Sequence, residues 1–174
     1  MLLMLYFISV ATTLSTQEWA WSVHPESGFK ILAPYALTDH ISEVPVEGAS
    51  IQYHQYRGGS VTDSILSMAF VVDYYQLPGK ADTVDEKFLR DFFENSIDPV
   101  LTAVHGSLDY MDVNREAGRD VCTWKGNYHG GEGIIRGQYI LVGDRYYGLQ
   151  VFGWAKSKPD ETMNRFFNSF KLIP

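Results

Sequence analysis

Four consecutive blocks of alternating apolar and polar residues constrain this chain more than any other feature. They are Leu108–Val113, Gly118–Asn127, Gly133–Val142 and Arg145–Ala155. Because successive side chains of a β-strand point to opposite faces, this period of two predicts four strands. Gly143-Asp144 separates the last two blocks by a tight hairpin turn, whose positive φ glycine accepts readily. The segment is therefore expected to form an antiparallel meander.

A long segment before the meander has the period of a helix. Between Val84 and Val104, apolar residues recur every three or four positions, which predicts an amphipathic helix. Thr83-x-x-Glu86 is the capping box expected at its start. Pro99 should kink or break this helix near Ile97, because proline lacks the N–H that the helical ladder needs.

A second helix is predicted at the end of the chain. Ser157-x-x-Asp160 is the expected cap, with Pro159 in the first turn. The apolar stripe expected to face the core consists of Met163, Phe166, Phe167 and Phe170.

Three strands are predicted before the long helix, at Phe29–Ala33, Gly48–Arg57 and Ser64–Tyr75. The last is apolar on both faces, which is typical of a central strand. This order of elements favours an α+β fold, in which helices pack on a mostly antiparallel central sheet as an α-β-α sandwich. No linker or repeat divides the chain after Thr16, so residues 17–174 are expected to form one domain.

Several segments carry a resemblance to the PsbP-like family of small exported proteins. They are Gly28–Pro34 with its Phe-x-x-x-x-Pro entry strand, Phe70–Tyr75, the tyrosine-rich hairpin Gly137–Val151, and the phenylalanine-rich Phe166–Leu172. The resemblance spans nearly all of residues 17–174, and it implies an α-β-α sandwich and a non-enzymatic accessory or binding role. Its motifs are structural, so it supports the fold far better than the function and assigns no functional residue.

Residues 1–16 are expected to be a secretory signal peptide, because they are apolar and uncharged. Ser9-Val10-Ala11 fits a small-x-small cleavage pattern, and a cut after Thr16 is the other option. A buried N-terminal strand or helix is the alternative. The segment is too short for a membrane span and has no cysteine for lipid attachment. We therefore expect an exported protein, periplasmic or extracellular, that is not a lipoprotein and has no stable membrane span after cleavage.

Charge and cysteine content narrow the function classes. The 174 residues carry a net charge of −7 and no cluster of lysine and arginine, which argues against a nucleic acid or an anionic membrane as the main partner. The single cysteine, Cys122, excludes an internal disulfide and a cysteine metal cluster. It alternates with Trp124 in a predicted strand, and we expect it to be a small buried hydrophobe.

The sequence shows no catalytic motif: neither a Gly-x-Ser-x-Gly elbow nor a phosphate-binding glycine loop is present. This favours a protein that is not an enzyme and needs no cofactor. The alternative is a divalent metal at Tyr128-His-Gly-Gly-Glu132, where two glycines let His129 and Glu132 point to one place, with His54 as a further ligand if the strands bring it near. A plain hairpin connection with exposed polar residues competes with that interpretation.

Aromatic residues suggest where a ligand would bind. Tyr128, His129, Glu132, His54 and Tyr56 are the candidate binding residues. If His54 and Gln52 face solvent, Tyr56 shares their side of a strand, and an exposed Tyr/His/Arg patch would suit a protein or a glycan. Core packing of these tyrosines is the competing interpretation. We expect an exported, non-catalytic binding or accessory module with an unidentified protein partner or small ligand; a metal protein or metal-dependent enzyme, and a structural part of a cell-envelope assembly, are the alternatives.

Overall fold

The computed structural model describes residues 18–46, 49–59, 68–78 and 85–174. The expected signal peptide, Gly48, the first four residues of the predicted strand Ser64–Tyr75, and Thr83 and Val84 lie outside the described residues. In the described part of the chain, no helix is long and apolar enough to span a membrane.

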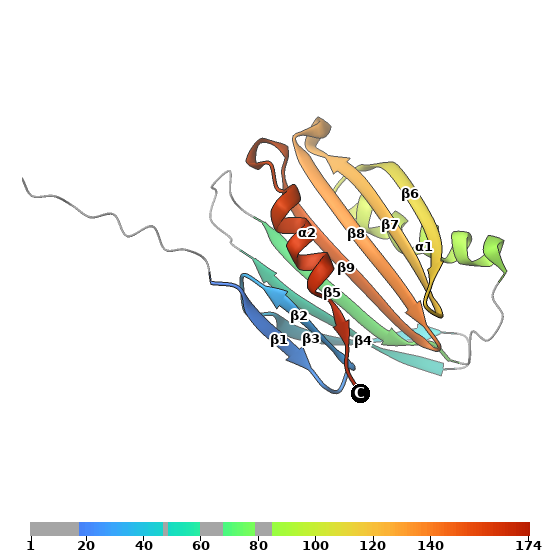
Figure 1. The fold of residues 1–174 in the computed structure, drawn as a ribbon. Helices are drawn as coiled ribbons and strands as arrows, with labels where there is room; N and C mark the ends of the chain where they lie inside the picture. Colours follow the sequence, from blue (N-terminus) through green and yellow to red (C-terminus); the bar gives the residue numbers. More distant parts are fainter. Residues whose placement is uncertain (1–17, 47–48, 60–67, 79–84) are drawn as a thin grey trace, which may run out of the picture.

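A seven-stranded antiparallel sheet forms the centre of the molecule (Figure 1). Its order is β3-β4-β5-β9-β8-β7-β6. The strands are β3 (Thr38–Val46), β4 (Ala49–Gly59), β5 (Ala69–Gln76), β6 (Ser107–Glu116), β7 (Arg119–Tyr128), β8 (Gly133–Val142) and β9 (Arg145–Trp154).

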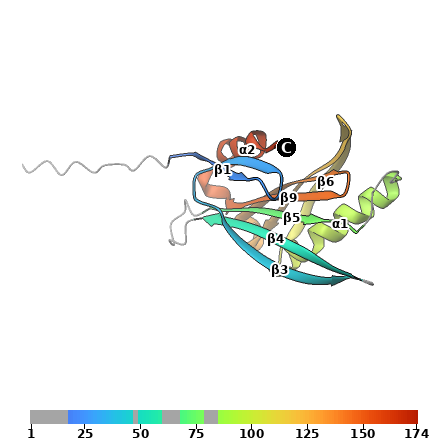
Figure 2. The same cartoon turned by 90° about the horizontal axis from the view of Figure 1, so that it is seen from below.

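The two faces of this sheet have different coverings. Helix α1 (Glu86–Ala103) lies on one face, and helix α2 (Asp160–Ser169) lies on the other (Figure 2). A three-stranded sheet of β1 (Ala20–His24), β2 (Phe29–Ala33) and β10 (Lys171–Leu172) shares the second layer with α2. That layer therefore contains strands as well as a helix.

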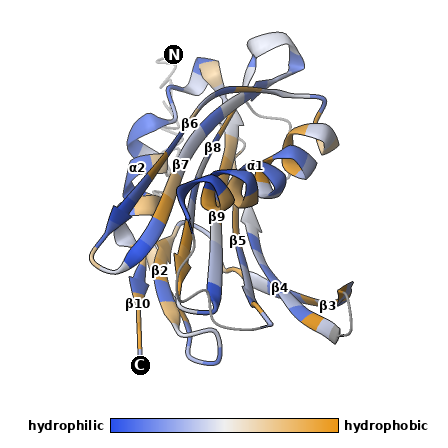
Figure 3. Ribbon diagram, turned by 90° about the vertical axis from the view of Figure 1, so that its right-hand side faces the viewer, coloured by the Kyte–Doolittle hydropathy of each residue, from blue (hydrophilic) through white to orange (hydrophobic). Residues whose placement is uncertain are grey.

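Two hydrophobic clusters fill the spaces between these layers, and β9 contributes to both. Tyr147, Leu149 and Val151 belong to the cluster with α2 and β2, whereas Tyr146 and Phe152 belong to the cluster with α1. Since the side chains of a strand alternate, β9 has a packed core on each face. In Figure 3, α1 lies in front of the strands it covers, while β3 and β4 extend beyond it.

The meander is confirmed, with β6 to β9 paired in sequence order and Gly143 at φ 61° in the hairpin turn. A mostly antiparallel sheet with helices packed on it is also confirmed. Cys122 is fully buried beside Trp124, as predicted, and burial raises the pKa of its thiol to about 12.

The helix ends differ from the prediction. Asp85, not Thr83, is the N-cap of α1, and its Oδ1 accepts a 2.7 Å hydrogen bond from the Phe88 N–H. The Ser157 hydroxyl donates to the Trp154 carbonyl instead of capping α2, which begins after Pro159. Asp85 is the N-cap because its carboxylate accepts the hydrogen bond of the backbone N–H three residues later.

Pro99 does not break α1, which is continuous from Glu86 to Ala103. Buried residues on both sides of the proline hold the helix against the sheet: Leu89, Phe93, Ile97 and Leu101. Tertiary packing of this face therefore outweighs the hydrogen bond that proline removes.

Strand β3 was not predicted. Nearly all of its side chains are exposed, so no apolar alternation marks it, and Pro45 reads as a strand breaker. It is an edge strand, where proline is tolerated because no neighbour needs its N–H.

Gly137 makes room for the largest buried side chain. It lies directly opposite Trp124 in the pairing of β7 with β8, and a Cβ at this position would overlap the indole ring. Glycine is thus required here by packing.

We expect Gly137→Ala to destabilise the protein by about 1–3 kcal/mol, the usual effect of overpacking a core. Urea denaturation would measure it. The matched control is Gly153→Ala on β9, where a Cβ would lie 3.4–3.5 Å from its nearest neighbours, an ordinary contact. Equal stability of the two variants would contradict the packing argument.

Candidate functional site

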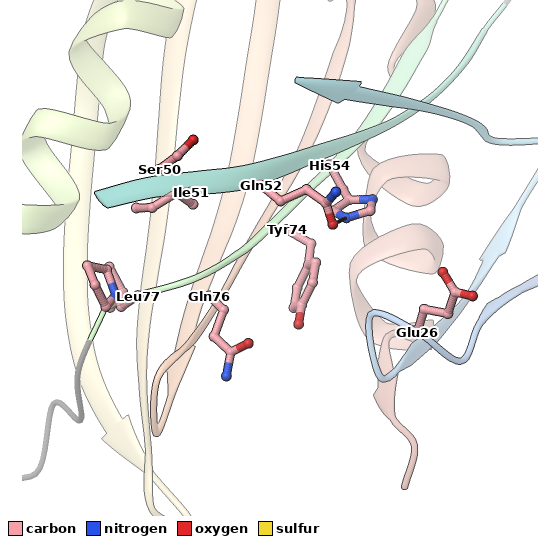
Figure 4. A pocket seen from close by; sticks show the side chains of 9 residues that line it. Glu26, Ser50, Ile51, Gln52, His54, Tyr74, Gln76 and Leu77 are labelled. Atoms are coloured by element: carbon pink, nitrogen blue, oxygen red, sulfur yellow. Dashed lines mark hydrogen bonds between the residues drawn. The ribbon is translucent and has the colours of Figure 1, made fainter. Parts of the chain in front are cut away.

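A polar groove lies between β4, β5 and the turn that joins β1 to β2. Its volume is about 450 Å³. The polar and aromatic side chains that line it are Glu26, Ser50, Gln52, His54, Tyr74 and Gln76 (Figure 4).

Strand register brings these side chains together. Gln52 and His54 alternate on β4, Tyr74 and Gln76 alternate on β5, and His54 pairs directly with Tyr74. Residues two apart on a strand share a face, so all four point to the side of the sheet that carries β1 and β2. Glu26 faces them from the β1–β2 turn (Figure 4).

His54 is held on both sides of its ring. Its Nδ1 lies 3.0 Å from Asp39 Oδ2 and its Nε2 lies 3.1 Å from Gln52 Oε1. A cationic ring donates to both oxygens; a neutral ring donates from Nδ1 to Asp39 and accepts from the Gln52 amide once that amide is turned over. Either arrangement occupies both nitrogens, so the imidazole is fixed in place.

The turn that carries Glu26 is anchored to the large sheet. Ser27 is buried, its Oγ lies 2.7 Å from the Tyr56 hydroxyl, and its carbonyl accepts a 2.9 Å hydrogen bond from the Tyr147 hydroxyl. The His24 ring stands 4.0 Å from the Tyr56 ring, and burial lowers the pKa of His24. These contacts fix the position of Glu26 over the groove.

Removing the Ser27 anchor should destabilise the protein. Ser27→Ala leaves the buried Tyr56 hydroxyl without its partner, which typically costs about 1–3 kcal/mol. Urea denaturation of Ser27→Ala, Tyr56→Phe and the double variant would measure the coupling. We expect the double variant to lose less than the two single losses combined, since it leaves neither group unpaired; strict additivity would show that this hydrogen bond is not formed.

The chemistry of the groove is that of hydrogen bonding. It offers the amides of Gln52 and Gln76, the hydroxyls of Ser50 and Tyr74, and the carboxylate of Glu26. Among the described residues that line it, none is lysine or arginine. A ligand there would meet hydrogen-bond donors, acceptors and one negative charge.

A smaller hollow of about 270 Å³ lies where α1 begins beside β6 and β7. Two of its charged groups are engaged with each other, because Arg115 Nε donates to Asp120 Oδ1 at 2.7 Å. It is the weaker candidate for ligand binding.

Asp73 is a buried carboxylate on the opposite face of β5. Its two oxygens accept hydrogen bonds from Gln55 at 2.8 Å and Gln150 at 2.7 Å. Burial raises the pKa of Asp73, while hydrogen bonds from Tyr53 and Gln55 and the charge of Arg57 lower it by less. Such a group can mark a functional site, but it is only 5% exposed, and its neighbours engage both oxygens.

The raised pKa of Asp73 makes stability depend on pH in a defined direction. The native state keeps the proton to a higher pH than the unfolded chain does, so this residue lowers stability as pH rises from about 4 through its native pKa. Asp73→Asn removes that term, so the stability of this variant relative to the wild type should rise between pH 4 and pH 7.

Chemical denaturation of both proteins at a series of pH values would test this. Comparison of the two proteins cancels the other carboxylates. A constant difference between them across this range would contradict the assignment.

The predicted ligand segment Tyr128–Glu132 is a hairpin connection between β7 and β8. His129 and Glu132 are exposed, and the Tyr128 hydroxyl donates to the Gly153 carbonyl at 3.2 Å. The His129 ring stacks on Trp154 with centroids 5.6 Å apart. The hairpin alternative describes this segment, and ligand or metal binding by Tyr128, His129 and Glu132 stays a prediction.

His54 and His129 do not come together. His54 lies in line with Tyr74 and Tyr147, whereas Tyr128 next to His129 lies in line with Trp154. Seven residues of β9 separate those two lines, roughly 23 Å at the rise of a strand. The described residues contain no group of three or more His, Cys, Asp or Glu side chains arranged for a metal ion.

Tyr56 does not form an exposed patch with His54 and Gln52. It is 3% exposed and packs in the core with Phe29, so the core-packing alternative holds for this tyrosine. Of the candidate residues, His54 lines the groove, and the Tyr56 ring stacks beside the His54 ring with centroids 6.0 Å apart.

Sequence reasoning missed Glu26, Asp39, Tyr74 and Gln76. The signal for Tyr74 and Gln76 was present, since they share the period of two with Gln52 and His54 on the neighbouring strand. Using it requires the register of β4 against β5, which the residues alone do not supply.

The architecture described above is that of a PsbP-like fold, as the sequence resemblance predicted. The solution structure of cyanobacterial PsbP (CyanoP) from Synechocystis sp. PCC 6803 matches it with a TM-score of 0.59. The match covers 95% of this chain and 99% of that chain at 11% sequence identity, so the likeness concerns the fold alone. No protein-family model matches the sequence. No curated protein matches it either.

Proposed function

We propose that this chain is a non-catalytic binding or accessory module and that the groove beside His54 is its binding site. The observation that carries the proposal is that both ring nitrogens of His54 are engaged while the surrounding amides, hydroxyls and carboxylate line an open groove. A general base needs a free nitrogen within reach of a substrate proton, and this imidazole has none to offer without losing Gln52 or Asp39.

Two further features support this role. The PsbP-like family, which the sequence resembles, implies accessory or binding functions, and the match to CyanoP supports that fold. The uncharged, apolar character of the first 16 residues is typical of a secretory signal, which supports a role outside the cytoplasm.

A thermal-melt panel tests the binding site. The full chain would be melted with neutral, cationic and anionic small molecules and short peptides. A ligand at 100 times its Kd should stabilise the protein by about 2.7 kcal/mol. We expect stabilisation by at least one class, reduced in Gln76→Ala.

Gln138→Ala is the matched control, since Gln138 is a half-buried glutamine on β8 of the same sheet that does not line the groove. Full retention of stabilisation in Gln76→Ala would contradict the groove as the site. Turnover of any substrate in parallel hydrolase assays would contradict the non-catalytic role.

The same panel tests the metal alternative. Stabilisation by Zn²⁺ that EDTA and His129→Ala both abolish would move the site to the Tyr128–Glu132 turn.

A further inference from the structure

We propose that the groove binds a neutral, polyhydroxylated ligand of the saccharide class. This inference rests on the proposed function and adds the ligand's chemistry to it.

The free hydrogen-bonding groups match those of a sugar. Gln76 Nε2 donates to Asp144 Oδ2 at 2.7 Å, which leaves its Oε1 as an acceptor for the groove. Gln52 uses one end of its amide on His54 and keeps the other end for a ligand. A hydroxyl both donates and accepts, so neighbouring hydroxyls can satisfy an amide and a carboxylate such as Glu26 together.

The charge of the groove disfavours anions. Its one charged carboxylate is Glu26, and no lysine or arginine is among the described residues that line it. Arg145 lies close by but packs against Gly28 and Tyr147, outside the lining. Because an exposed carboxylate attracts a cation only weakly in water, the several neutral donors and acceptors decide the specificity.

The groove also has an apolar side for the C–H face of a sugar ring. Tyr74 supplies it, on the same face of the sheet as Gln52, His54 and Gln76. The Tyr74 ring is held in place by its neighbours, with centroids 5.8 Å from His54 and 5.3 Å from Tyr147. A rigid aromatic surface beside a few fixed polar groups is a usual composition of a small-molecule site.

The volume suits a small ligand. About 450 Å³ lies in the lower part of the range of small-molecule sites, which is roughly 300–1,000 Å³. The groove is therefore matched to one or two sugar rings, with a longer chain able to continue outside it.

The experiment is an NMR titration of the full ¹⁵N-labelled chain with neutral disaccharides: maltose, cellobiose, trehalose and N,N′-diacetylchitobiose. Spermidine and inorganic phosphate serve as the cationic and anionic comparisons. We expect at least one disaccharide to shift the amide signals of Gln52, His54, Tyr74 and Gln76 in a saturable way, with neither spermidine nor phosphate doing so.

Gln76→Ala should weaken the saccharide about five- to tenfold, the effect of one lost hydrogen bond, and Gln138→Ala should leave it unchanged. Saturable shifts from spermidine or phosphate at the groove, without any from a disaccharide, would overturn the saccharide assignment and leave the binding module intact. If none of these probes shifts groove signals, the saccharide assignment fails; the thermal-melt panel then decides separately whether the groove binds anything.

Discussion

Strand β9 has protein packed on both of its faces, and the rest of the structure depends on that constraint. Six consecutive residues, Tyr146 to Val151, are buried there, alternately against the α1 side and the α2 side. A one-residue slip in register would exchange these two sets and place each in the wrong core. The pairing of β5 and β8 with β9 is fixed in this way, and through β5 so is the pairing of β4, which carries His54.

The covering of the sheet ends at β4 and β5, and the polar clusters of the molecule meet there. His54 and its partners lie on one face of this pair of strands, and Asp73 with its two glutamines lies on the other. On β8 and β9, in contrast, apolar clusters cover both faces of the sheet. Polar side chains of β4 and β5 therefore line the groove, where a ligand can reach them.

Structural features that arise from local sequence patterns could be predicted, whereas features that depend on contacts between distant residues could not. The four-strand meander, the turn at Gly143 and the burial of Cys122 follow from local alternation, and α1 follows from its three-and-four spacing. Tertiary packing overrides the break expected at Pro99, Asp85 takes the capping role predicted for Thr83, and the Ser157 hydroxyl bonds the Trp154 carbonyl instead of capping α2. The groove needs contacts between residues far apart in the chain: Glu26 is held over it through Ser27, whose hydroxyl bonds Tyr56, 29 residues away. Neither that bond nor the register of β4 against β5 has a local signal.

The anchored β1–β2 turn makes the groove a preformed binding site. Glu26 stands next to Ser27, whose side chain and carbonyl are tied to tyrosines of β4 and β9, while Gln52 and His54 hold each other on β4. Both walls are therefore positioned before any ligand arrives, and little ordering entropy is lost on binding. A preformed set of neutral donors and acceptors selects a ligand by the directions of its hydrogen bonds rather than by its charge. That is the form of recognition that a hydroxyl-rich molecule requires and that a simple ion cannot exploit.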